Sequence, residues 1–464
     1  MLAHRRNLLA GSAAAVAFAG LARHATAQAS ATGRETYVNE VEGYGPLIVD
    51  PNGLLDLPEG FTYQVVAQSG DTMDDGLYAP GQPDGMACFP LEGSQVALVV
   101  NHELRGSRAL HRNMGPGGLR QERIGLLDAS KAFDTFKDGT PLPGGCSTII
   151  YDLSTRQMLS RTLTLAGTST NCCGGPTPWG SWLTCEETIE TPADANVTKA
   201  HGWVFEVPAR ATGLVDPVPL KAMGRFDHEA VCVDPRTGMV YQTEDTNDGL
   251  FYRFIPHTPG QLSNGGRLQA MALKGSPSAD TRNQDRRSWN VGDWHEVEWI
   301  DLDDVEDPAG NLRLRGHASG AALVARGEGI WWGQDEMYFT ATSGGPIRRG
   351  QVMRLVPGLN GTPDRLQLFV ESTDEKTVNM ADNITIAPWG HLILCEDNYS
   401  NEIRNHLKGV TPKGQLYTLA RNAFAGNSEF AGACFSPDGE VLFVNIMYPG
   451  VTLAIRGPWT SVRT

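Results

Sequence analysis

The chain of 464 residues carries 53 acidic and 38 basic side chains, and its net charge of −15 argues against nucleic acid and anionic membrane surfaces as partners. Its length fits roughly two or three average domains, although an all-β architecture often exceeds that size as one unit. Glycine accounts for 53 residues, and turn clusters separate short β-branched and aromatic runs, so the composition favours an all-β protein. We expect a monomer that acts on a small molecule.

The first element in chain order is a leader. Arg5 and Arg6 precede an apolar run at 8–22, and a small-x-small cleavage site follows at 25–27. The apolar run is too short for a lasting membrane anchor. Paired arginines before such a run indicate the twin-arginine route, so residues 1–27 are expected to be a signal peptide that directs the protein to the periplasm. The alternative is an ordinary secretory signal whose arginines happen to be adjacent.

Residues 28–58 are expected to form an N-terminal arm, and residues 59–464 the main domain. Six segments of this domain share one pattern: a leading polar residue, a short apolar strand, a turn, a second apolar strand and trailing polar residues. A further short strand follows each segment, and such repeated hairpins are typical of a β-propeller, here with six blades. The six segments are 83–103, 171–187, 228–245, 326–343, 382–397 and 429–446.

The two ends of the repeat predict how the ring closes. The last repeat has only three predicted strands, and the early apolar stretch 61–68 can supply the fourth. Because this pairing removes an exposed sheet edge, we expect the N-terminal strand to close the last blade. Two insertions interrupt the repeat, at 104–145 and 256–316, and the second contains one strand-like stretch, WHEVEWIDL. They either cover the functional face or are inert additions.

The polar residues at the two ends of each hairpin carry the chemistry. Two short antiparallel strands joined by a tight turn bring their outer ends side by side. In a propeller these ends share one face near the central channel, so thiols and carboxylates that are separated in sequence meet there. The positions collected in this way are Asp84, Asn101, His102, Glu103, Cys172, Glu186, Glu187, Glu229, Glu244, Arg326, Glu328, Asp382, Glu396, Asp397 and Glu429.

So many carboxylates around one channel repel one another unless cations neutralise them. Carboxylate and amide oxygens suit Ca²⁺, whereas the thiolate of Cys172 suits iron, zinc or copper and binds calcium poorly. We therefore expect a transition metal beside the calcium. For any single carboxylate the alternative is a solvated side chain or a turn cap, but the repetition at matched positions favours metal.

Arg326 stands two positions before Glu328 at the start of one hairpin. It is either a structural counter-ion within the carboxylate cluster or the group that holds an anionic substrate such as phosphate with a bidentate fork. The sequence contains no Gly-x-Ser-x-Gly motif and no histidine cluster for zinc, so nucleophilic serine chemistry has no support. Most of the other cysteines recur within strands, as small buried residues do.

Together with the twin-arginine leader, five motifs resemble the PhoX family of bacterial alkaline phosphatases. They are VVNHE (99–103), NCCGGPTPWGSWLTCEE (171–187), DHEAVCVD (227–234), RGEG (326–329) and LCEDN (394–398). The resemblance runs through most of the chain, and its most specific part is the segment 171–187. It implies a six-bladed propeller with a mixed iron(III)–calcium cluster that hydrolyses phosphate monoesters, with a metal-held oxide or hydroxide as the nucleophile.

The resemblance also assigns roles residue by residue. The bridging thiolate falls on Cys172, and the iron-binding glutamates fall on Glu229 and Glu328. The calcium-side glutamate falls on Glu187, and the phosphate-binding arginine on Arg326.

Asn101, Glu103 and Asp382 also match metal-binding positions of the family. This chain is shorter than the best-known members and has an additional Cys173, so contacts to the substrate are expected to differ more than metal binding.

Three other functions remain open on the sequence. The first is a phosphodiesterase or phosphotriesterase on the same scaffold. The second is a calcium-dependent, lactonase-like six-bladed hydrolase, against which the thiol of Cys172 and the guanidinium of Arg326 both count. The third is a periplasmic binding or scaffold propeller whose calcium is purely structural.

Overall fold

The computed structural model describes residues 36–400 and 402–464. The expected signal peptide at 1–27 lies outside the described residues, as does the beginning of the arm at 28–58. Strands dominate the described part of the chain, and its α-helices are the short α1 (Ala109–Arg112) and α2 (Leu312–Ala318). None of the helices described is long or apolar enough to cross a membrane. The fold is therefore all-β, as the composition predicts.

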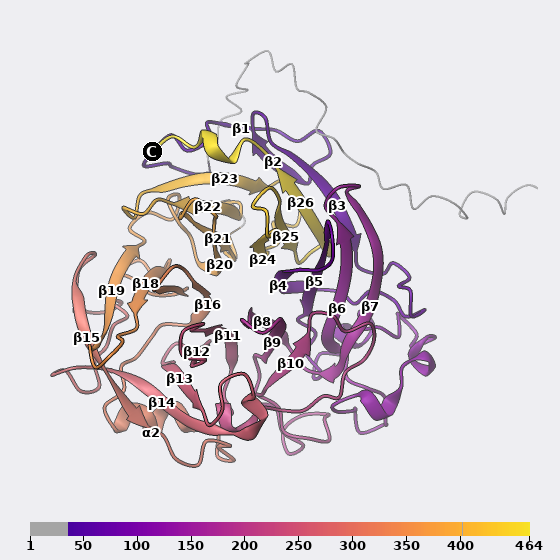
Figure 1. Cartoon of the computed structure of the whole chain (residues 1–464), viewed down its shortest axis with the longest axis horizontal. Coiled ribbons are helices and arrows are strands. Elements are labelled where there is room, and N and C mark those ends of the chain that lie inside the picture. The colour runs from indigo at the N-terminus through magenta and orange to yellow at the C-terminus, as the bar shows by residue number, and fades with distance from the viewer. Residues whose placement is uncertain (1–35, 401) are drawn as a thin grey trace, which may run out of the picture.

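The strands form antiparallel sheets that radiate from a central axis in a propeller-like arrangement (Figure 1). The first sheet has the order β4-β5-β6-β7, and the second β10-β9-β8. Their bounds are β4 (Pro83–Pro90), β5 (Gln95–His102), β6 (Gly144–Asp152), β7 (Gln157–Thr168), β8 (Asn171–Pro176), β9 (Ser181–Glu186) and β10 (Val204–Pro208).

The largest sheet joins two four-stranded meanders through one additional strand. Its order is β11-β12-β13-β14-β15-β19-β18-β17-β16, so β15 pairs with the outer strand of each meander. The bounds are β11 (His228–Val233), β12 (Val240–Glu244), β13 (Phe251–Pro256), β14 (Gly266–Leu273), β15 (Trp294–Asp301), β16 (Gly327–Trp332), β17 (Met337–Ala341), β18 (Gln351–Val356) and β19 (Asp364–Glu371).

The last two sheets involve both ends of the described chain. The sheet β20-β21-β22-β23 is extended at its outer edge by β2 and β1, which come from the N-terminal arm, and the sheet β24-β25-β26 is extended by β3. The bounds are β1 (Leu47–Ile48), β2 (Leu55–Pro58), β3 (Thr62–Gln68), β20 (Ala381–Ile386), β21 (Leu392–Glu396), β22 (His406–Val410), β23 (Leu416–Asn422), β24 (Phe430–Phe435), β25 (Leu442–Ile446) and β26 (Val451–Arg456).

All six predicted hairpins form, and their first strands lie nearest the centre of Figure 1. These inner strands contact one another in the order β4, β8, β11, β16, β20 and β24, and β24 contacts β4 again. The predicted closure is also confirmed, because β3 pairs antiparallel with β26 from Thr62 opposite Arg456 to Gln68 opposite Val451. The ring therefore closes through two strands from opposite ends of the described chain.

The region 256–316 contains more regular structure than the sequence analysis predicts. The expected stretch WHEVEWIDL forms β15, but β14 and α2 lie in the same region. Small alanines alternate with larger residues in β14, so its apolar signal is weak, although Leu268, Ala270 and Ala272 are buried. β14 completes the meander of β11–β13 rather than interrupting it.

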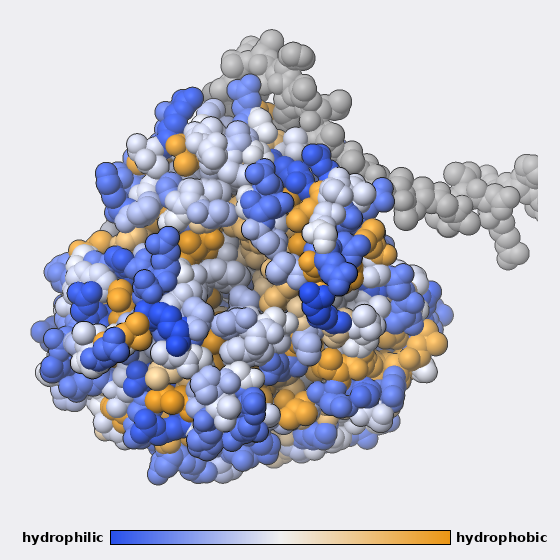
Figure 2. All heavy atoms as spheres, viewed as in Figure 1, coloured by the Kyte–Doolittle hydropathy of each residue, from blue (hydrophilic) through white to orange (hydrophobic). Residues whose placement is uncertain are grey.

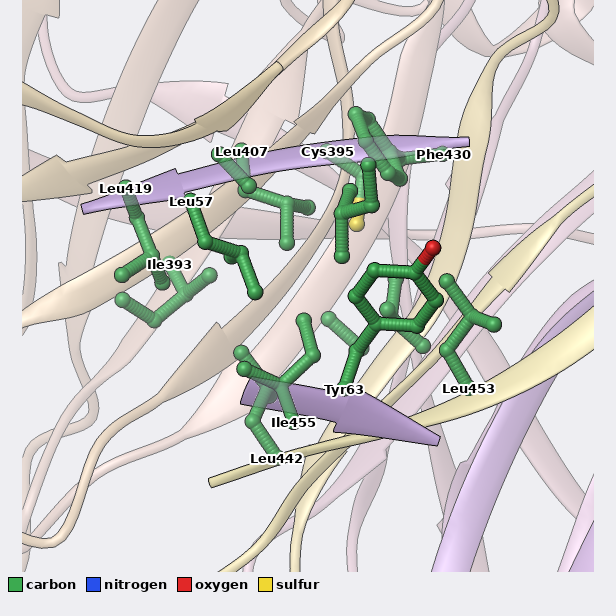
Figure 3. Packing of buried hydrophobic residues seen from close by; sticks show 14 of the residues in the cluster. Leu57, Tyr63, Ile393, Cys395, Leu407, Leu419, Phe430, Leu442, Leu453 and Ile455 are labelled. Atoms are coloured by element: carbon green, nitrogen blue, oxygen red, sulfur yellow. The ribbon is translucent and has the colours of Figure 1, made fainter. Parts of the chain in front are cut away.

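The hydrophobic core is divided into clusters that lie between neighbouring sheets. Figure 3 shows one of them, where side chains from the β20–β23 sheet and from the β24–β26 sheet meet, with Tyr63 of β3 among them. Cys395 belongs to this cluster and is completely buried. All eight cysteines are free thiols, and all but Cys88 are buried, in line with the prediction that most of them serve as small core residues.

Candidate active site

A β-bulge recurs at the channel end of the inner strands and aims one side chain from each into the channel. In five inner strands the ladder shifts register directly after its first residue pair. A bulge leaves one residue unpaired and redirects its side chain, which explains why polar residues at the start of apolar strands avoid the core. The first residues of the five bulges are Asp84, Cys172, Glu229, Glu328 and Asp382.

Four of the five bulges are also preceded by the same backbone turn. Gln82, Thr170, Arg326 and Met380 each stand two positions before a bulge residue, and each has a left-handed φ between 46° and 56°. Such angles are uncommon for residues other than glycine and mark a sharp local turn. The turn directs the chain into the inner strand with its first polar side chain facing the axis.

Gly85 shows how closely the inner strands approach one another at the axis. A Cβ atom at this position of β4 would lie 2.5 Å from the Cα atom of Cys173 on β8. Only glycine permits this contact, so the residue after Asp84 fixes the spacing between Asp84 and the Cys172 bend.

Four second strands each supply a further carboxylate from the position immediately after the strand. Consecutive residues of an extended chain point to opposite sides, so the last residue of the strand and its successor face different surroundings. The successors Glu103, Glu187, Asp245 and Asp397 line the central cavity.

The last residues of these strands are tied into the sheets instead. Glu186 accepts hydrogen bonds from the backbone N–H groups of Ser169 and Gly202, Glu244 accepts from the Tyr252 hydroxyl, and Glu396 accepts from the Asn379 backbone N–H. Glu186, Glu244 and Glu396 are therefore structural, although the sequence pattern collects them with the channel residues.

His201 connects the carboxylate of Glu186 to the insertion at 104–145. Its Nδ1 atom lies 2.7 Å from Glu186 Oε1, and its Nε2 atom lies 3.1 Å from Asp134 Oδ2. All three side chains are completely buried. Burial alone lowers the pKa of His201, but the two carboxylates outweigh it and raise the pKa to about 9. The imidazolium therefore supplies one positive charge between two buried carboxylates.

The cavity at the centre of the ring has a volume of about 550 Å³. Figure 2 shows a face of the molecule that is hollowed at its centre. Nine carboxylates and one thiol line the cavity, and three arginines, Arg105, Arg108 and Arg326, stand against them. The acidic and thiol residues are Asp84, Glu103, Cys172, Glu187, Glu229, Asp245, Glu328, Asp382, Asp397 and Glu429.

Four groups of three residues have ligand atoms within 4.8 Å of one another, as a bound metal ion requires. Neighbouring groups share Glu229, Asp382 or Glu429, so the groups form a connected series. The groups are Cys172–Glu187–Glu229, Glu229–Glu328–Asp382, Asp382–Asp397–Glu429 and Asp84–Glu103–Glu429.

The electrostatics of the cavity favour cations strongly. Burial, followed by repulsion from neighbouring carboxylates, raises the pKa of Asp84, Glu187, Glu328 and Glu429 well above the ordinary values. Without compensating charge, such carboxylates take up protons; bound cations remove that repulsion and keep them ionised.

The same causes act on the remaining donors. Burial and neighbouring charges raise the pKa of Glu103 to about 7 and that of Asp382 to about 7. Burial and then the charge of Glu229 raise the pKa of the Cys172 thiol. A buried carboxylate cluster with one thiol among its donors fits a site for several metal ions of different softness.

Arg326 is held by carboxylates of the cavity wall. Its Nε atom donates to Asp245 Oδ1 (2.7 Å) and its Nη2 atom to Asp245 Oδ2 (2.8 Å) and Glu328 Oε1 (2.9 Å). Burial lowers its pKa, but the charges of Glu328 and Asp245 outweigh this effect and raise it. The bidentate fork thus engages Asp245, which the sequence analysis did not select, and the structure places Arg326 next to Glu328.

Asn101 is not among the residues that line the cavity. Its Nδ2 atom donates to the carbonyl oxygens of Cys172 (3.1 Å) and Cys173 (2.7 Å), and its Oδ1 atom accepts from Trp182 Nε1 (2.8 Å) and Cys146 Sγ (3.1 Å). The side chain is completely buried, so these bonds use its amide fully. In this structure Asn101 holds the bend that carries Cys172 and offers no free atom to a metal.

The adjacent cysteines face different surroundings. Cys172 lines the cavity, whereas Cys173 packs in a hydrophobic cluster with Ala230 and Ile330 and has its Sγ atom 3.5 Å from Asn383 Oδ1. The two thiols therefore have separate roles in the structure.

Comparison with known proteins identifies the family. The sequence model described as Alkaline phosphatase PhoX matches residues 42–131 and 143–450. The chain belongs to the PhoX family of alkaline phosphatases. It is therefore a phosphatase, and the metal-dependence of this family agrees with a cavity whose acidic groups can hold metals.

One solved structure supports the fold, and two others are more distant. Pseudomonas fluorescens PhoX in complex with vanadate, a transition state analogue, is 18% identical with a TM-score of 0.64, covering 91% of this chain and 98% of that one. A gluconolactonase from Xanthomonas campestris is 12% identical with a TM-score of 0.40, covering 89% and 98%. The Pseudomonas aeruginosa periplasmic gluconolactonase PpgL is 15% identical with a TM-score of 0.40, covering 83% and 89%. No curated protein matches the sequence significantly.

Most of the expected site residues of this PhoX family member meet in the one cavity. Those it brings together are Cys172, Glu187, Glu229, Glu328, Asp382, Glu103 and Arg326. Asp84, Asp397 and Glu429 also line the cavity; the hairpin-end pattern includes them but assigns them no role. Asp245 lines the cavity as well, and the sequence did not predict it. Its signal is the acidic pair 244–245, which repeats the pairs 186–187 and 396–397.

The two insertions contribute unequally to the cavity. Residues 104–145 supply Arg105 and Arg108 to its wall, and no described residue of 256–316 lines it. Arg105 is fixed by hydrogen bonds to the Thr170 hydroxyl (3.3 Å) and the Glu187 carbonyl oxygen (3.0 Å). The first insertion is therefore part of the functional face.

Proposed function

We propose that this phosphatase is exported to the periplasm and hydrolyses phosphate monoesters with iron(III) and calcium held in the central cavity. The observation that carries the proposal is the connected series of four donor groups, one of which contains a thiol. Oxygen donors suit Ca²⁺, and the thiolate calls for a transition metal beside it.

In this proposal iron is held by Cys172, Glu229 and Glu328, and Glu187 stands on the calcium side of the thiolate. When bound, the metals supply an activated oxygen nucleophile and neutralise charge on the phosphoryl group. The remaining oxygen donors are assigned to calcium; they are Asp84, Glu103, Asp382, Asp397 and Glu429.

Arg326 binds the phosphoryl group in this proposal while it positions a metal ligand. Its Nε and Nη2 atoms are committed to Asp245 and Glu328, and its Nη1 atom has no hydrogen-bond partner among the described residues. Nη1 can donate to a phosphoryl oxygen without releasing either carboxylate. A guanidinium that is already oriented by two carboxylates loses little conformational freedom on binding, which favours the transition state.

The proposal includes the architecture and the location. We count six blades, with the nine-stranded sheet contributing two that are joined by β15. The leader at 1–27 is assigned to the twin-arginine route, and the protein to the periplasm as a monomer. The closed ring of inner strands supports this count.

The test combines metal analysis with turnover on protein purified from its native compartment. We expect iron and calcium together, and hydrolysis of p-nitrophenyl phosphate faster than that of bis(p-nitrophenyl) phosphate or a lactone. Calcium without iron in fully active protein would contradict the cluster. Faster hydrolysis of the diester would favour the diesterase, and lactone cleavage alone would favour the lactonase.

A further inference from the structure

The outer rim of the cavity differs chemically from its wall. Twelve of the residues that line the cavity are charged, whereas Tyr399 and Tyr448 are the aromatic residues among the described residues that line it. Tyr399 is 71% exposed and Tyr448 is 41% exposed. Neither ring stacks on another aromatic ring in the described part of the chain. The rim therefore offers two aromatic side chains without an aromatic partner.

The two tyrosines reach the rim from different sheets. Tyr399 lies in the loop between β21 and β22, and Tyr448 in the loop between β25 and β26. Both side chains line the same cavity as Asp397 and Glu103. Both are also open to solvent, so a molecule that enters the cavity can contact them.

The loop that carries Tyr399 is pinned on both sides of the ring. The backbone N–H of Asn398 donates to Asn405 Oδ1 (2.7 Å), and the backbone N–H of Ser400 donates to Asn398 Oδ1 (3.0 Å). Asn427 Nδ2 donates to the carbonyl oxygen of Ser400 (2.9 Å), which ties the loop to the strand connection before β24. An exposed ring on a fixed backbone is pre-organised to receive a ligand, because little backbone entropy is lost on binding.

The same connection holds Tyr448. Its backbone N–H donates to the hydroxyl of Ser428, the residue after Asn427 (2.9 Å). Asn427 and Ser428 therefore link the two loops, and the positions of the two tyrosines are set by one network. The cavity of about 550 Å³ is in the range of sites that hold a complete small molecule, so it has room for more than a phosphoryl group.

We propose that Tyr399 and Tyr448 form a leaving-group subsite that favours phosphate monoesters with a planar aromatic leaving group over those with an aliphatic one. The inference rests on the proposed function, because the phosphoryl group must bind at the charged wall for the leaving group to reach the rim. Tyrosine rings bind flat apolar surfaces at low entropic cost because the side chain has few rotatable bonds. A substrate that places a ring at the rim gains these contacts, and a polyol leaving group does not.

The test compares two esters in each variant, so that differences in intrinsic reactivity cancel. For the native holoenzyme, Y399S, Y448S and the double variant, kcat/KM is measured with 1-naphthyl phosphate and with glycerol 2-phosphate. We expect the naphthyl-to-glycerol ratio to fall about three- to tenfold in each single variant, the effect of losing one aromatic contact, and further in the double variant. Y399F is the matched control: it keeps the ring, and its ratio stays close to that of the wild type.

A binding measurement separates the subsite from the chemistry. Phenylphosphonate and methylphosphonate carry the same anionic group, and only the first carries a ring. We expect Y399S and Y448S to raise the inhibition constant of phenylphosphonate more than that of methylphosphonate. The subsite would be overturned if kcat/KM fell equally for both esters and both inhibitors weakened equally, or if the naphthyl-to-glycerol ratio of the double variant stayed unchanged. Either result would leave the proposed phosphatase activity intact. Failure of the wild type to hydrolyse either ester would overturn the proposed function itself, and the subsite with it.

Discussion

Raising the pH should weaken the folded protein through one buried residue, His201. The imidazolium lies between Glu186 and Asp134, and all three side chains are completely buried. In the folded protein the pKa of His201 is raised from the ordinary 6.5 to about 9 by these carboxylates, which outweigh the opposing effect of burial. Burial also opposes ionisation of Asp134, but its hydrogen bonds, first of all with His201, lower its pKa.

The sign of the effect follows from proton binding. Because the folded state holds the proton more tightly than the unfolded state, the stabilisation is complete below about pH 6.5 and is lost as the pH rises through about 9. A difference of about 2.5 between the two pKa values corresponds to about 3 kcal/mol of unfolding free energy. About 2.5 kcal/mol of it should disappear between about pH 7 and about pH 10, where two buried carboxylates face a neutral ring.

Urea unfolding followed by tryptophan fluorescence at the two pH values measures this loss. The wild type should lose about 2.5 kcal/mol more than H201Q on going from about pH 7 to about pH 10, because the variant has no imidazole to deprotonate. H257Q replaces an exposed histidine and serves as the matched control, which should follow the wild type. If the wild type and H201Q lost the same stability, the buried imidazolium between two carboxylates would be refuted.

Three further predictions concern the cavity. Cys172→Ser should abolish bound iron and activity, whereas Cys173→Ser should retain iron, because only Cys172 lines the cavity; equal iron content in the two variants would show that the wrong thiol was chosen. Arg326→Lys should keep its metals, but its kcat/KM should fall by an amount equivalent to about 2–4 kcal/mol of transition-state stabilisation. The reason is that lysine cannot hold Asp245 and Glu328 and also donate to phosphate. Unchanged kinetics and unchanged inhibition by orthophosphate would remove Arg326 from the site. EGTA should abolish activity reversibly and lower the thermal midpoint, because the repelling carboxylates lose their cation; an enzyme untouched by EGTA would show that calcium is not the ion.

The hairpins could be predicted from the sequence because each has polar residues at both ends of two short apolar runs. The last repeat lacked a fourth strand, so the apolar stretch 61–68 was predicted to complete its sheet, and β3 does pair with β26. β14 was less visible, since the alanines at 270 and 272 give little apolar contrast although both are buried.

The site was harder to predict, because a shift of one residue decides which side chain faces the cavity. Glu244 and Asp245 are adjacent and acidic, and their side chains point to opposite sides of the chain. To choose between them, one must know at which residue β12 ends. Asn101 posed a different problem. An amide can bind a metal or satisfy backbone groups, and only the tertiary neighbours, here the carbonyl oxygens of Cys172 and Cys173, distinguish these roles.

The pairing of β3 with β26 also determines the order in which the protein can be assembled. Residues 62–68 leave the ribosome early, but their partner strand, Val451–Arg456, is synthesised more than 380 residues later. Until then β3 has no partner strand in its sheet, and the last blade stays incomplete. Closing so long a loop costs chain entropy that only the completed ring recovers. The complete ring therefore cannot form until Val451–Arg456 has been synthesised and pairs with the early strand.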